Sequence, residues 1–118
     1  MTEPNWKLDD DLKTVTVTFP SDPPVSLKLD AAAVDALVHG LGGLRAQMQP
    51  QPAPDFPTGQ QFLAAQDPSF VTETDAMQNS VVHLRDPRFG WLHYMVPREK
   101  ARKLAVSLAM QSDSTLQL

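Results

Sequence analysis

Two histidines, His83 and His93, are the side chains of this 118-residue sequence best suited to chemistry. They lie in two alternating segments joined by Asp-Pro-Arg-Phe-Gly, a composition typical of a turn between antiparallel strands. If Arg85 pairs with Trp91, His83 faces His93 across the hairpin, within reach of a common metal ion. No carboxylate is evident on that face as a third donor, and two nitrogens alone make a weak zinc site. We therefore expect paired surface histidines, with no metal and no cofactor.

The sequence contains none of the common catalytic motifs. Serines, histidines and aspartates occur, but none lies in a Gly-x-Ser-x-Gly elbow, and the chain has no cysteine. The run Gly40-Leu-Gly-Gly43 lacks the Lys-Ser/Thr of a phosphate-binding loop. The adjacent carboxylates Asp9, Asp10 and Asp11 are expected to be solvated in a turn. The sequence therefore favours a non-enzymatic protein.

The strand face that carries the two histidines is unusually apolar for a surface. It forms the candidate interface, which consists of Val81, His83, Arg85, Trp91, His93 and Met95. Tryptophan and arginine are enriched among the residues that dominate protein interfaces. Three alternatives remain for what covers this face: the segment 49–70 of the same chain, a second copy, or a foreign ligand or partner. Under either of the first two, we expect Trp91 to be buried.

Basic residues are concentrated between positions 81 and 103. That segment carries a net charge of +4 and the remainder −8, which sum to the −4 of the whole chain. The start of a helix is the unfavourable end for cations, so helix stability does not explain this cluster. An anion- or nucleic-acid-binding regulatory module using segment 85–103 is therefore the alternative function, although a pI near 5.1 argues against nucleic acid. Its candidate anion-binding residues, expected to be exposed, are Arg88, Arg98, Lys100, Arg102 and Lys103.

Two related units make up most of the chain, which is expected to be a single domain over 1–118. A first β-hairpin/helix unit at 5–48 and a second at 70–111 are separated by a Pro/Gln-rich connector at 49–69. A flexible tail at 112–118 follows. We expect an α+β fold in which the two units, ββ(β)α repeated, form one compact domain with an antiparallel sheet and helices on one side.

The elements of the first unit are the clearest. Its strands alternate strictly, and a Pro/Asp-rich turn places Phe19 opposite Val25, so that one face is continuously apolar. Asp30 is expected to cap a helix over 31–48, with a break or kink near Gly42 because three glycines lie in it. A second helix is expected over 97–111, and a short one near 60–66 in the connector.

Composition and charge complete the expectation. Hydrophobic residues at 42% and charged residues at 20% are typical of soluble globular proteins. No apolar run approaches the roughly 20 residues of a membrane helix, and the N-terminus has no secretory pattern. We expect a soluble, cytoplasmic protein with no membrane association, which acts through protein–protein binding as a homodimer, with a further protein partner also open. A small-ligand-binding protein or enzyme with a pocket between the two units is a second alternative.

Overall fold

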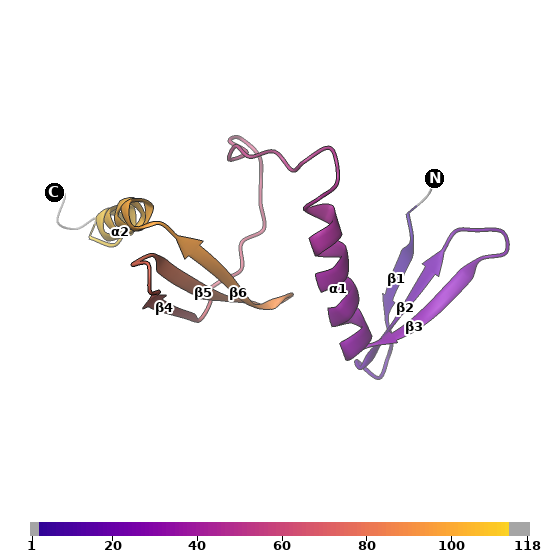
Figure 1. Ribbon diagram of the computed structural model, residues 1–118. Helices are drawn as coiled ribbons and strands as arrows, with labels where there is room; N and C mark the ends of the chain where they lie inside the picture. The colour runs from indigo at the N-terminus through magenta and orange to yellow at the C-terminus, as the bar shows by residue number, and fades with distance from the viewer. Residues whose placement is uncertain (1–2, 114–118) are drawn as a thin grey trace. The chain divides into compact units, whose positions relative to one another are not determined.

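The computed structural model describes residues 3–113 and has an α+β fold of two three-stranded antiparallel sheets and two helices. The chain divides into unit 1, residues 1–60, and unit 2, residues 61–118. Each unit contains three consecutive strands followed by a helix (Figure 1). The predicted class is thus confirmed, and the element order of the two halves is the same.

Sheet A of unit 1 has the strand order β1-β2-β3, with β1 at Asn5–Leu8, β2 at Thr14–Phe19 and β3 at Val25–Asp30. The predicted register is confirmed, because Phe19 pairs with Val25 and Val17 with Leu27. Alternation therefore collects the apolar side chains of all three strands on one face. Val17, 2% exposed, is the one buried hydrophobic residue among the described residues.

Helix α1, Ala31–Arg45, begins where β3 ends. Asp30 caps it as predicted, since its Oδ1 accepts a hydrogen bond of 2.9 Å from the amide of Ala33. The expected break near Gly42 is wrong: α1 continues through its three glycines as one helix and gives way to turns after Arg45. The glycines weaken a helix without forbidding it.

Sheet B of unit 2 has the order β4-β5-β6, with β4 at Phe70–Thr74, β5 at Ser80–Asp86 and β6 at Gly90–Val96. The predicted pairings of Arg85 with Trp91 and His83 with His93 are both confirmed. Pairing extends one step further, to Asp86 and Gly90, so the loop comprises residues 87–89. Gly90 adopts φ = 74°, a conformation that favours glycine at the end of such a loop.

The prediction that each helix packs over one face of its sheet differs from the structure. Helix α1 contacts sheet A mainly at β3, and α2, Arg98–Ser112, has no buried residue and no extensive packing against the described strands. The physical reason is the length of the connections, because α1 follows β3 directly and only Pro97 separates β6 from α2. Turning a helix back over a sheet ordinarily takes a loop of about 2–6 residues.

The remaining segments differ in detail from expectation. The short helix expected near 60–66 is absent, since those residues have neither helix nor strand conformation. The expected flexible tail lies largely outside the described residues, apart from Ser112 and Asp113 at the end of α2. Within residues 3–113, neither helix has the length and apolar character needed to cross a bilayer.

Candidate functional site

The candidate interface residues lie together on one face of sheet B. Strand pairing places Val81 beside Met95, His83 beside His93 and Arg85 beside Trp91, with their side chains on the same side. The third strand, β4, adds two more residues to this face: Val71, opposite His83, and Glu73, opposite Val81.

A chain of hydrogen bonds joins three of these side chains. The Nε2 atom of His83 lies 2.6 Å from Oε2 of Glu73. The Nδ1 atoms of His83 and His93 are 2.7 Å apart, and the two rings meet edge to face with centroids 5.0 Å apart. The His83 side chain is only 19% exposed, whereas Glu73 lies at the surface. Glu73 therefore orients His83, which in turn orients His93.

Glu73 is the residue of this candidate site that sequence reasoning missed. The expectation that no carboxylate shares the histidine face is wrong, because β4 pairs with β5 in a register that brings Glu73 onto it. The alternation of Phe-Val-Thr-Glu-Thr already marks Glu73 and Val71 as one face of a strand. The missing information was the register between strands that a five-residue turn segment separates. No group of three or more His, Cys, Asp or Glu side chains in the described chain converges on a metal position.

Trp91 is half-exposed, at 43%, in the single chain. Residues 61–70, the part of the segment that belongs to unit 2, therefore leave Trp91 half-exposed, and its burial under the whole segment or by a second copy stays a prediction. Met95 on the same face is 66% exposed, and Leu63 of the segment is 93% exposed. The face thus presents apolar surface around a polar histidine pair.

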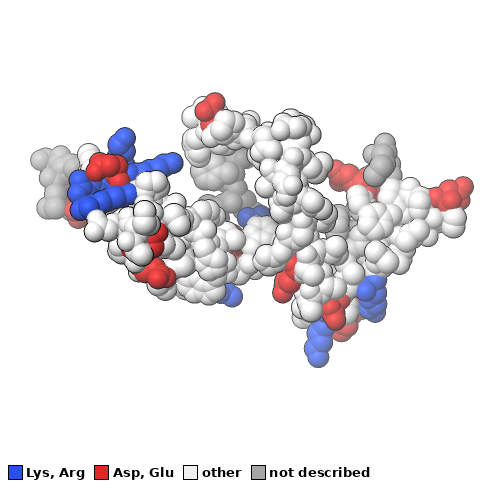
Figure 2. Space-filling view, viewed as in Figure 1, with Lys and Arg blue, Asp and Glu red and all other residues white. Residues whose placement is uncertain are grey.

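The basic residues at the start of α2 are exposed, as expected. Figure 2 shows Lys and Arg side chains gathered over this helix. Two of them have polar partners: Arg98 donates to Oε1 of Gln78 at 2.9 Å, and Arg102 lies 3.3 Å from Glu99. Arg88 belongs to the hairpin loop instead, where it lies over the Phe89 ring and 3.7 Å from Asp86. The sequence-predicted anion-binding residues therefore divide between two separate places.

An apolar groove lies between α1 and sheet A in unit 1. Figure 1 shows that the helix and the sheet meet at one end and diverge from there. The groove has a volume of about 320 Å³ and is lined only by apolar residues: Trp6, Val15, Val17, Leu29, Val34, Leu37, Val38 and Leu41. Small-molecule sites carry a few convergent polar groups, and this groove has none among its lining residues.

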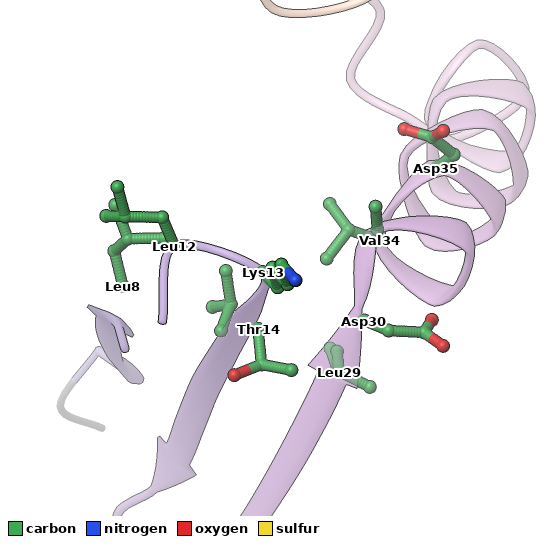
Figure 3. Close-up of a pocket in the computed structure, with 10 residues that line it drawn as sticks. Leu8, Leu12, Lys13, Thr14, Leu29, Asp30, Val34 and Asp35 are labelled. Carbon is green, nitrogen blue, oxygen red and sulfur yellow. The ribbon is translucent and has the colours of Figure 1, made fainter. Parts of the chain in front are cut away.

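A smaller hollow of about 190 Å³ lies at the end of sheet A where α1 begins (Figure 3). Leu8 at the end of β1 and Leu12 of the β1–β2 turn lie on one side of it and Val34 on the other. Asp30 also lines it, but this carboxylate is committed to the α1 cap. The volume is below the roughly 300 Å³ of typical ligand pockets, so we assign no ligand to it.

The aspartates of the β1–β2 turn make more hydrogen bonds than expected for solvated side chains. Asp9 accepts hydrogen bonds from the hydroxyls of Thr14, at 2.7 Å, and Thr16, at 2.9 Å, and lies 3.7 Å from Nζ of Lys28. The Thr14 hydrogen bond is the main cause that lowers the pKa of Asp9 below its ordinary value, against a smaller opposing effect of burial. These contacts fix the turn to the polar face of sheet A, which gives Asp9 a structural role.

Comparison with models of protein families, with curated proteins and with solved structures finds no match to this chain.

Proposed function

We propose that this protein is non-enzymatic and acts by binding proteins, in the first place a second copy of itself. The observation that carries the proposal is the exposed apolar surface. Within the described residues both helices lack a buried side chain, and the groove beside α1 is unfilled. Apolar surface of this extent on a folded chain is typical of an interaction site.

Helix α2 of the second copy is the proposed occupant of the groove. Leu104 and Leu108, with Ala101 and Ala105, recur at the spacing that forms one apolar face of a helix. Both leucines are about half-exposed. Helices α1 and α2 each have 15 residues, or ~22 Å of length, so α2 can lie along the whole of α1. An amphipathic helix in an apolar groove is a common mode of protein recognition.

Charge favours the same pairing. Unit 1 has eight acidic and four basic residues, a net charge of −4. The first six residues of α2 have four basic side chains and Glu99, a net charge of +3. Complementary charge raises the rate and specificity of association. The basic cluster thus has a role in this proposal without an external anion. Reciprocal docking between two copies closes a symmetric dimer.

The face of sheet B around Trp91 is a second proposed contact surface, because aromatic residues enrich interface centres. We do not place it in the α2-groove contact. It remains available to a further protein partner.

Sedimentation equilibrium across a range of concentrations tests self-association. We expect a species of about 26 kDa, twice the 13.0 kDa of the chain, that dissociates on dilution. Raising the salt concentration from ~0.05 to ~0.5 M is expected to weaken the dimer, since salt screens complementary surface charges. A single 13.0 kDa species up to high micromolar concentration would overturn the second-copy proposal and leave the groove to another protein.

A further inference from the structure

The hydrogen-bonded residues Glu73, His83 and His93 on sheet B have no role in the proposed function. Two features make this group unusual for a surface cluster. Its histidines are directly opposite each other on paired strands, and their Nδ1 atoms face each other at 2.7 Å. The outer nitrogen of His83 is held by a carboxylate.

The hydrogen-bond partners determine which histidine nitrogen atoms carry a proton. A carboxylate accepts hydrogen bonds only, so Nε2 of His83 carries a proton and donates it to Glu73. In neutral His83 the Nδ1 atom is then an acceptor, and the proton between the rings belongs to Nδ1 of His93. If that proton moves to Nε2 of His93, the ring stays neutral and both Nδ1 lone pairs become available. Because the two nitrogens point at each other across the hydrogen bond, each ring also has to turn to direct its lone pair at a common ion. No proton has to leave the protein.

The spacing of the two nitrogens fits one coordination geometry better than another. Adjacent ligands of a square-planar or tetragonal ion with bonds of ~2.0 Å lie ~2.8 Å apart, close to the observed separation. Adjacent ligands of a tetrahedral ion with the same bonds lie ~3.3 Å apart, which would require the strands or rings to separate. Nitrogen donors in tetragonal geometry are characteristic of Cu²⁺, which also stands highest in affinity among divalent first-row metals.

Glu73 matches the outer partner that metal-binding histidines ordinarily have. A carboxylate on the far nitrogen fixes the tautomer and orientation of the ring and raises the basicity of the ligating nitrogen. In His83 that tautomer presents Nδ1 towards His93. Arg85, two residues along β5 on the same face, opposes a bound cation, and the Glu73 carboxylate offsets it.

We propose that His83 and His93 chelate a divalent transition-metal ion of tetragonal preference, Cu²⁺ above all, through their Nδ1 atoms. Glu73 acts as the outer-shell carboxylate, and water fills the remaining positions. This inference goes beyond the proposed function and does not depend on self-association. With two protein donors, the site is open and its affinity is moderate.

A Cu²⁺ titration of the full chain, followed by electron paramagnetic resonance, tests the site. Glycine is present as a weak competing chelator to suppress binding to the N-terminal amine. We expect one equivalent per chain with hyperfine structure from two imidazole nitrogens, and weaker binding of Zn²⁺ in a parallel titration. Zn²⁺ binding tighter than Cu²⁺, or a signal without imidazole nitrogen, would overturn the proposal.

Three variants locate the site. Glu73→Gln keeps the shape of the side chain and is expected to weaken Cu²⁺ binding ~10- to 100-fold, and His93→Ala by more than that. His39→Ala is the matched control, because His39 lies on α1 with its Nδ1 bonded to the carbonyl of Asp35, and it should bind as the parent does. Circular dichroism confirms that each variant is folded, and Glu73→Gln decides the matter if His93→Ala does not fold. Equal binding by Glu73→Gln and the parent, or a loss in His39→Ala, would refute the assignment.

Discussion

Replacing Leu41 with alanine separates the proposed self-association from the folding of unit 1. Leu41 lines the apolar groove and is 61% exposed in the single chain. Alanine is at least as good a helix former as leucine, so α1 itself is not weakened. The substitution therefore removes two sets of contacts. The smaller set lies within the monomer, and the larger set is made with the docked helix of the second copy.

The magnitude follows from that division. Complete burial of a leucine side chain is worth about 1.5–3 kcal/mol. The exposed 61% is then worth ~0.9–1.8 kcal/mol, and a symmetric dimer has two such sites, or ~1.8–3.6 kcal/mol in total. At about 1.4 kcal/mol for each factor of ten, the dissociation constant of the dimer should rise ~20- to 400-fold. The monomer loses only ~0.6–1.2 kcal/mol of its free energy of unfolding.

Sedimentation equilibrium measures the dissociation constant, and urea unfolding at a concentration below it measures the stability of the monomer. Leu63→Ala is the control, since this leucine is 93% exposed and lies outside the groove. Equal dimerisation by Leu41→Ala and the parent chain would refute helix docking in the groove. A loss of stability without a change in dissociation constant would mean that Leu41 supports only its own unit.

Three further predictions follow from local geometry. Gly42→Ala should raise the free energy of unfolding by ~1 kcal/mol, since alanine favours a helix and a Cβ at this position meets no atom within 4 Å. An unchanged or lower melting temperature would contradict the prediction. A weaker dimer in the same variant would place Gly42 at the interface. The lowered pKa of Asp9 means that the stability it adds is present above its ordinary value of 3.8 and is lost as the pH falls through the lower folded value, so urea unfolding of Asp9→Asn should vary less below pH 4 than that of the parent. Equal acid sensitivity of the two would contradict this. Trp91→Ala should lower the free energy of unfolding by ~2 kcal/mol, less than for a fully buried tryptophan, and a change of under ~0.5 kcal/mol in chemical denaturation would show that its packing against sheet B is unimportant.

The local pattern of the sequence determined the strands, their pairing within each hairpin and the cap of α1. Alternation with period two assigns side chains to faces, and the turns fix which residues meet, so His83 opposite His93 and Phe19 opposite Val25 were predictable. Asp30 was predictable as a cap because its carboxylate accepts a hydrogen bond from a backbone amide in the first turn of the helix. All of these depend on residues close together along the chain.

Only the tertiary structure decided what lies between elements. The position of Glu73 beside His83 depends on the register of β4 against β5, which periodicity alone does not set. The open groove beside α1 arises because helix and strand are joined without a loop, while the apolar pattern alone predicted a covered sheet. An apolar face must be covered, but hydrophobic burial is non-directional, so the sequence pattern does not state which surface covers it.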